Sequence, residues 1–241
     1  MKRIRFLFRF LRYFPQTVYF NFKFLRPKDA IKLPILLYKP RFGKLSGRVE
    51  IKSKEIRFGM IRLGFPSNNL YSGKGIFMEI AGNGKLIFEG ETFFGNDCGI
   101  SVGPKGKLVL GDGLYARVGV KICAYHYVKI GERTLFAWNI TIMDTSFHTL
   151  KDATSGEHLS AKPYGTIIIG KGNWICSECL ILKGAWTNDN VILGARSVLS
   201  RKLESEPNCI AVGNPPQIVK TGVYLDMKDS NVEYDWYGDC E

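Results

Sequence analysis

The chain has 241 residues, of which 45% are hydrophobic and 23% are charged, proportions that are ordinary for a globular protein. This length allows one domain, or one domain with an appendage, and it can bury a sizeable core. The net charge of +12 is unevenly placed: residues 1–62 hold 17 lysines and arginines against three acidic residues, whereas the remainder holds 17 against 19. The basic character therefore belongs to the N-terminal quarter.

Residues 1–60 form a basic segment in which phenylalanine, leucine and tyrosine are interleaved with arginine and lysine. A helix is one expectation for part of this segment. Arg9 and Arg12 interrupt its apolar run, which excludes a signal-peptide core and a membrane span. Three hypotheses remain. The segment covers the end of the fold with its aromatic rings packed inward, it lies on an anionic membrane surface, or it binds nucleic acid, which we do not favour.

Two stretches of the chain repeat every six residues. From Ile169 to Leu199 the first position of each hexad is aliphatic except at Thr187, and the fifth position is small or short; a similar pattern runs from Val118 to Ile142. Neither the period of a helix nor that of a strand produces it. A short fixed repeat of this kind is typical of a β-solenoid. We therefore predict an all-β solenoid over residues 61–221, whose outer coils before Val118 are irregular.

The register of the hexads breaks once. Ile169 follows Ile142 by 27 residues, which is not a multiple of six, so the chain leaves the solenoid and returns. This excursion, residues 148–164, is polar and holds two of the three histidines, and a loop on a rigid scaffold is a common place for a site. After Leu199, residues 209–220 are predicted to form a closing strand. Residues 222–241 form an acidic tail that could fold back on the basic segment.

Six cysteines without a secretory signal indicate a reducing compartment, so we expect a cytoplasmic protein with free thiols, held peripherally at the inner membrane face if the basic segment binds lipid. Cys176 and Cys179 have the spacing of half a zinc site, but a second pair is missing and both fall on positions that favour small residues. We expect no metal.

Together, Ile169-Gly-Lys-Gly-Asn-Trp-Ile, the hexads after it and Ala211-Val-Gly-Asn-Pro-Pro-Gln-Ile-Val-Lys resemble the hexapeptide-repeat acyltransferases, in particular the branch with sugar and polysaccharide O-acetyltransferases. The resemblance covers residues 75–221, and two N-terminal segments are similar to capsule and lipopolysaccharide members. It implies a left-handed parallel β-helix of triangular section with three hexads per coil. It also implies a homotrimer with acyl-CoA bound between subunits.

The same resemblance places the catalytic histidine of the family at His148. A sugar hydroxyl needs a base to take its proton, and neutral imidazole suits that role near pH 7. Asp144 could orient His148 or hold the acceptor. It follows His126 by three hexads, so the two should stack, either as part of an acceptor pocket with Tyr125 or as an exposed pair of no consequence. Asn139 completes the candidate acceptor residues.

For the co-substrate, acetyl-CoA, the resemblance implies seven binding positions: Trp174, Ser177, Ala195, Ser197, Arg201, Lys202 and Lys220. Backbone groups at small residues would meet the pantetheine amides, and the cations would meet the phosphates. Two residues depart from the family pattern, because Arg196 and Cys176 stand where glycine is usual. Their side chains either crowd the pantetheine channel or face solvent.

The leading hypothesis is an O-acetyltransferase acting on a sugar hydroxyl of a cell-surface polysaccharide or a lipid-linked glycan precursor. Two alternatives are an N-acetyltransferase of a nucleotide-linked amino sugar and a non-catalytic solenoid that binds membrane or nucleic acid through its basic arm. A zinc carbonic anhydrase, another enzyme on this fold, is excluded because His126, His148 and His158 include no closely spaced pair.

Overall fold

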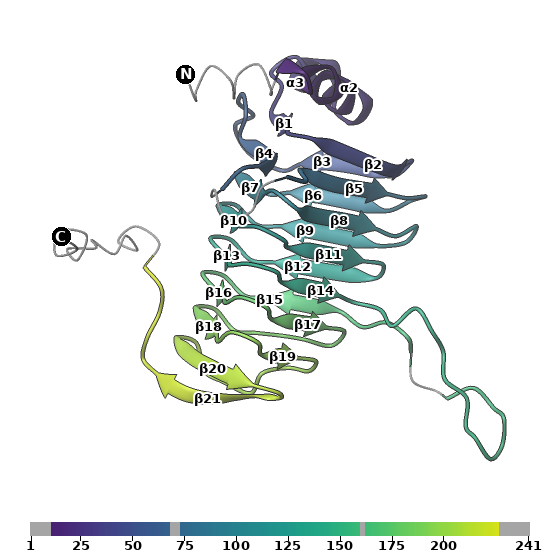
Figure 1. Cartoon of the computed structure of the whole chain (residues 1–241), viewed down its shortest axis with the longest axis vertical. Helices are drawn as coiled ribbons and strands as arrows, with labels where there is room; N and C mark the ends of the chain where they lie inside the picture. Colours follow the sequence, from purple (N-terminus) through teal and green to yellow (C-terminus); the bar gives the residue numbers. More distant parts are fainter. Residues whose placement is uncertain (1–10, 68–72, 160–161, 227–241) are drawn as a thin grey trace.

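A computed structural model describes residues 11–67, 73–159 and 162–226, which form a parallel β-helix with two short helices at its N-terminal end (Figure 1). The coils stack along one axis and contribute strands to three sheets, which confirms the predicted solenoid. Sheet A contains β1 (Ile35–Leu37), β4 (Ile61–Phe65), β7 (Thr92–Gly95), β10 (Leu114–Ala116), β13 (Leu135–Phe136), β16 (Trp174–Ile175), β18 (Val191–Leu193), β20 (Cys209–Gly213) and β21 (Pro216–Thr221). Sheet B contains β2 (Pro40–Leu45), β5 (Ile76–Ile80), β8 (Cys98–Val102), β11 (Lys121–Ala124), β14 (Thr141–Met143), β17 (Leu180–Leu182) and β19 (Val198–Leu199). Sheet C contains β3 (Arg48–Ile51), β6 (Lys85–Phe88), β9 (Lys107–Leu110), β12 (Tyr127–Ile130) and β15 (Ile167–Ile169).

The hexads predict the interior correctly. Every first and fifth position from Ile169 to Leu199 is buried, including Thr187, whose hydroxyl accepts the N–H of Gly170 at 3.1 Å. From Val118 to Ile142 the same positions are buried too. Ser146, the next fifth position, is exposed because the chain is already leaving the coil there. The core is therefore a column of aliphatic side chains along the solenoid axis.

The coils do not have one length. In sheet B, Ile100 stands opposite Ile122 and Ile122 opposite Ile142, so successive coils there take 22 and 20 residues. The expected three hexads per coil are found only after the excursion, where Ile181 stands opposite Leu199. The solenoid also starts earlier than residue 61, because Ile35 of β1 already pairs with Ile61. The first coils include long connections, and these hide the repeat in the sequence.

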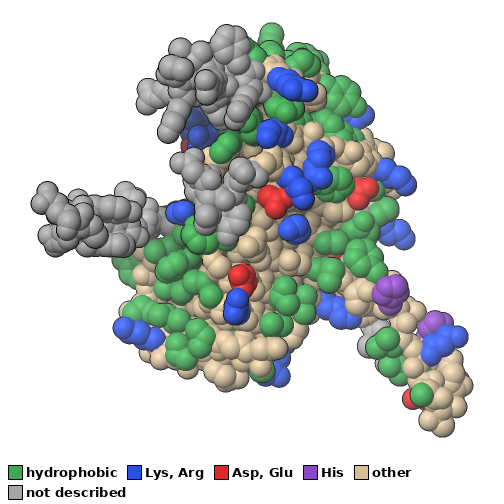
Figure 2. All heavy atoms as spheres, in the orientation of Figure 1, with side chains coloured by type: hydrophobic (Ala, Val, Ile, Leu, Met, Phe, Trp, Pro, Cys, Tyr) green, Lys and Arg blue, Asp and Glu red, His purple; other side chains and the backbone are tan. Residues whose placement is uncertain are grey.

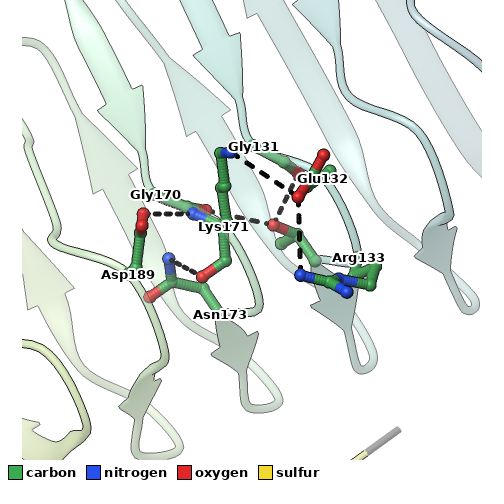
Figure 3. Close-up of polar contacts among 8 residues, drawn as sticks. Gly131, Glu132, Arg133, Gly170, Lys171, Asn173 and Asp189 are labelled. Carbon is green, nitrogen blue, oxygen red and sulfur yellow. Dashed lines mark hydrogen bonds and ion pairs between the residues drawn. The ribbon is translucent and has the colours of Figure 1, made fainter.

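The corners between sheets C and A are held by the main chain and by short polar side chains. From Gly113 onward, residues in the left-handed region of φ recur there once per coil, and Asn190 and Asn208 are of a type that tolerates it. The carboxylate of Asp189 accepts the N–H of Lys171 at 2.7 Å, and Glu132 lies within 3.6 Å of the Lys171 ammonium (Figure 3). Exposed ion pairs of this kind stabilise little, so the backbone geometry dominates.

Helix α2 (Phe14–Phe24), followed by the single turn α3 (Pro27–Ala30), closes the N-terminal end of the solenoid (Figure 1). The Asn21 amide donates to the carbonyl of Ile35 at 2.7 Å, and its oxygen accepts the Ile35 N–H at 3.2 Å. The Thr17 hydroxyl accepts the N–H of Leu37 at 3.0 Å. These two buried polar side chains satisfy the open edge of β1, which would otherwise be free to pair with another strand.

At the C-terminal end β21 runs antiparallel to β20, so the predicted closing strand is a hairpin. The excursion between β14 and β15 projects far from the solenoid, as its polar sequence predicts (Figure 1). Most of the acidic tail, residues 227–241, lies outside the described residues, and so does the expectation that it folds back. Among the described residues, no helix is long and apolar enough to cross a bilayer.

Candidate active site

Asp144 is fully buried just after β14, and two backbone groups of the preceding coil hold its carboxylate. Oδ1 accepts the N–H of Tyr125 at 2.8 Å, and Oδ2 accepts the N–H of His126 at 2.7 Å. Burial raises the pKa of this carboxyl above its ordinary value, while these hydrogen bonds oppose the shift. Asp144 therefore contacts His126 through the main chain. The 20-residue coil is the reason: Met143 lies opposite Cys123, which sets Asp144 beside the start of the turn.

Both ends of the excursion loop are pinned to this corner. The ring of Phe147 meets that of Tyr125 edge-on at 4.9 Å between centroids, and Tyr164 packs against His126 at 4.7 Å. The Lys183 ammonium lies 3.3 Å from the Ser146 hydroxyl and donates to the carbonyl of Lys162 at the same distance. His148 comes directly after Phe147, and it is exposed. The structure thus brings Tyr125, His126 and Asp144 to one corner between sheets B and C, and His148 is the next residue after Phe147 at the base of the loop.

Two further polar residues, which the hexads do not reveal, lie on the outer face of sheet B beside Tyr125. The Ser101 hydroxyl donates to Oε2 of Glu79 at 3.0 Å, and its oxygen lies 3.5 Å from the phenol oxygen of Tyr125. Glu79 and Ser101 are paired residues of β5 and β8, and Ser101 is paired with Cys123 of β11. A repeat of 22 residues in this part of the sequence is the signal that could have predicted that they lie together.

Asn139 lies away from this group, at the corner between sheets A and B. There the N–H of Glu178 donates to the carbonyl of Trp138 at 2.8 Å, and the N–H of Arg196 donates to that of Ser177 at 3.0 Å. Asn139, Ser177 and Ala195 therefore occupy corresponding corners of successive coils. Within one chain, strand β14 separates Asn139 from Asp144, so Asn139 groups with the expected acetyl-CoA residues and not with the acceptor residues.

The expected acetyl-CoA positions differ in what they offer. Ser197 is fully buried and its hydroxyl accepts the N–H of Gly213 at 3.0 Å, so its side chain is structural and cannot reach a ligand. Trp174, by contrast, is half-buried on the outer face of sheet A. Arg201 and Lys202 line a hollow of about 350 Å³ against the final hairpin, whose outer strand carries Lys220, an exposed residue.

The two departures from the family pattern do not fill the interior. The Arg196 side chain is 81% exposed, and its Nε lies 2.6 Å from a carboxylate oxygen of Glu178. Cys176 is half-buried at the same corner. Arg196 therefore extends along the surface of the chain.

A metal has no evident place in the described part of the chain. No group of three histidine, cysteine or acidic side chains in residues 11–67, 73–159 and 162–226 could hold one. The five cysteines found there are free thiols.

The chain is similar in structure to the polysialic-acid-specific acetyltransferase NeuO, with a TM-score of 0.51, 17% identity and coverage of 80% of this chain and 91% of NeuO. At that identity the likeness shows the fold. The chain has the fold of the hexapeptide-repeat acyltransferases. The three sheets are accordingly the faces of a left-handed parallel β-helix, as the resemblance of the sequence motifs predicts.

Two curated proteins are similar in sequence over part of their length. The galactoside O-acetyltransferase of Escherichia coli strain K12 is 28% identical over 111 residues, which are 46% of this chain and 52% of that protein. The chloramphenicol acetyltransferase of Agrobacterium fabrum is 30% identical over 76 residues, 32% of this chain and 35% of that protein. The chain thus spans about half or less of these relatives. No protein-family model matches it.

Proposed function

We propose that the protein transfers an acetyl group from acetyl-CoA to a hydroxyl of a sugar in a cell-surface polysaccharide or a lipid-linked glycan precursor. The observation that carries the proposal is the pinned loop base: Phe147 packs on Tyr125, Tyr164 packs on His126, and the exposed His148 follows Phe147 in the chain. The names of the partly similar curated proteins, two acetyltransferases, support the type of reaction.

In this mechanism His148 is the general base. Its imidazole takes the proton of the acceptor hydroxyl as that oxygen bonds to the acetyl carbon, and it returns the proton to the departing sulfur. Bound acetyl-CoA supplies the acetyl group as a thioester. Asp144 acts indirectly: by tying down the N–H groups of Tyr125 and His126 it fixes the surface on which the loop base packs. Neutral imidazole is suited to this exchange near pH 7.

The acceptor would lie against the outer face of sheet B next to His148. Three groups lie close together there: the carboxylate of Glu79, the hydroxyl of Ser101, and the ring and hydroxyl of Tyr125. Sugar hydroxyls are both donors and acceptors, so a carboxylate and two hydroxyls can hold them, and an aromatic ring can cover a sugar face.

We further propose a homotrimer with acetyl-CoA between subunits. On one chain His148 lies on the loop that leaves the corner of sheets B and C, whereas Ser177 and Ala195 lie at the corner of sheets A and B. A second subunit whose corner between sheets A and B lies next to His148 of the first would complete the site. The hollow beside Arg201 and Lys202 would take a phosphate-bearing end, because both cations are exposed there. Glu204 also lines this hollow and lies 3.7 Å from the Lys202 ammonium. The free thiols favour a cytoplasmic location.

The test is acetyl transfer from labelled acetyl-CoA to a panel of soluble sugars and amino sugars. His148→Ala should lower kcat by about 10²- to 10⁴-fold, the usual contribution of a general base. His158→Ala is the matched control, since it removes the other exposed histidine of the same loop and should leave kcat unchanged. Release of the label by mild alkali identifies an ester, and retention identifies an amide.

Two results would overturn the proposal. One is transfer to none of the sugars by the wild-type protein. The other is full turnover by His148→Ala in a chain whose size in gel filtration matches the wild type.

A further inference from the structure

Helix α2 has an unusual distribution of side chains. Its inner face carries Thr17 and Asn21, whose polar groups satisfy the edge of β1, together with Phe20. Its outer face carries aromatic residues in their place: Tyr19 is 52% exposed and Phe22 is 51% exposed. An ordinary surface helix places its polar residues outward, so this outer face has the composition of one that meets an apolar environment.

The outer face is also strongly basic. The exposed residues of the helix and of the chain on either side of it, Leu11, Arg12, Pro15, Tyr19, Phe22, Lys23 and Arg26, include three basic residues and no acid. The Lys23 ammonium lies 5.7 Å from the centroid of the Tyr19 ring, so cation and ring share one surface. The ten residues before Leu11 add four basic residues and no acid in the sequence.

The turn after the helix extends this surface. Ile31 is 73% exposed and is flanked by the exposed Lys28 and Lys32. Asp29 is the one acidic residue from Leu11 to Lys32, and it is neutralised by Arg26 at 3.1 Å. Hydrophobic and basic side chains thus lie together over the N-terminal end of the solenoid, as the upper part of Figure 2 shows.

We propose that this end of the solenoid docks on an anionic lipid bilayer, with Tyr19, Phe22 and Ile31 inserted at the interface and the lysines and arginines against the lipid headgroups. Aromatic side chains partition into the interfacial zone, and cations next to them are attracted by anionic lipids. The two contributions reinforce one another here because they come from the same turns. The solenoid axis would then stand away from the membrane, since α2 lies across the end of the coil stack (Figure 1). This inference is independent of the acetyl-transfer activity.

The test is flotation of the full chain with vesicles of phosphatidylcholine alone and of phosphatidylcholine with roughly a quarter phosphatidylglycerol. We expect binding to the anionic vesicles only, weakened by high salt because exposed charges are screened. The pair Tyr19→Ser and Phe22→Ser, and separately Lys23→Glu and Lys28→Glu, should each lower vesicle binding by about tenfold or more.

The matched control is Val219→Ser with Tyr224→Ser, which removes two equally exposed apolar side chains near the other end of the solenoid and should bind like the wild type. If the variant with Tyr19→Ser and Phe22→Ser does not fold, the variant with Lys23→Glu and Lys28→Glu still tests the proposal. Wild-type protein that floats with neither vesicle overturns the proposal, as does undiminished binding by both pairs. Binding to single-stranded DNA without binding to vesicles overturns it too. Acetyl transfer to a soluble sugar is measured separately and should be unchanged in both pairs.

Discussion

The carboxylate of Asp144 accepts the backbone N–H of His126 at 2.7 Å, although the two residues are 18 positions apart. The other oxygen of the Asp144 carboxylate accepts the N–H of Tyr125. Both oxygens of the carboxylate therefore hold the main chain of the neighbouring coil. In the proposed mechanism Asp144 is a positioning residue, which fixes the main chain of Tyr125 and His126 where their rings pack against the loop base.

Asp144→Ala should lower the free energy of unfolding by about 1–3 kcal/mol, because it leaves two backbone N–H groups without their buried acceptor. Urea unfolding followed by circular dichroism measures this change. Asp152→Ala is the control, since Asp152 also accepts two backbone N–H groups but lies exposed in the loop. An equal loss in both variants would show that burial of Asp144 is not the reason.

Gly103 is the place where the ring of Tyr125 lies directly against the main chain, so a Cβ there would overlap that ring. Gly103→Ala should push the ring away from Ser101 and Phe147 and raise KM for the acceptor by about three- to tenfold. Gly99→Ala, on the preceding strand of the same sheet, meets its nearest neighbour at 3.9 Å and should leave KM unchanged. Steady-state kinetics with both substrates compares them, and an unchanged KM in Gly103→Ala would contradict the placement of the acceptor.

The edge of β1 depends on Asn21. Asn21→Leu keeps roughly the volume of the side chain but removes its hydrogen bonds to both backbone groups of Ile35, so the unfolding free energy should fall by about 1–3 kcal/mol. Lys23→Ala, on the outer face of the same helix, should change it by less than about 0.5 kcal/mol. Thermal or urea unfolding of both variants checks this. An unchanged unfolding free energy in Asn21→Leu would mean that water or another group forms hydrogen bonds with the backbone of Ile35.

The buried thiols should be chemically silent in the folded chain. Burial raises the pKa of Cys98 to about 12 and that of Cys179 to about 11. At pH 8 only about one molecule in a thousand or fewer then carries the reactive thiolate at either position, and its rate of alkylation should rise about tenfold per pH unit up to that pKa. Peptide mapping after iodoacetamide treatment, with and without urea, reports each cysteine. Rapid labelling of Cys98 in the native chain would contradict its burial.

The inside and outside of the coils could be predicted from sequence because the side-chain direction along a solenoid is a local property. A hexad that begins with Ile175 or Ile181 places its first and fifth side chains inward whatever the neighbouring coils do. The excursion loop could be predicted for the same reason, since a break in a local period needs no tertiary information to be seen.

The partners of each residue could not be predicted in this way, because they depend on the length of every coil. Glu79 and Ser101 join Tyr125 only because two coils take 22 residues, a length set by how each corner closes and not by the hexads. Asn139 and Asp144 likewise lie at opposite ends of β14, so they reach different corners of the coil. Ser197 differs, because as a fifth position of its hexad it points inward whatever the coil length.

By itself, the sequence determined that this protein is a solenoid with two histidines on its excursion and a basic, aromatic N-terminal segment. Only the tertiary structure decided which surface that segment presents. Thr17 and Asn21 face inward because an open strand edge must find hydrogen-bond partners, and the helix is then left with Tyr19 and Phe22 outside. Local periodicity sets the direction of a side chain, whereas the closing of coils and the capping of their edges set what it meets.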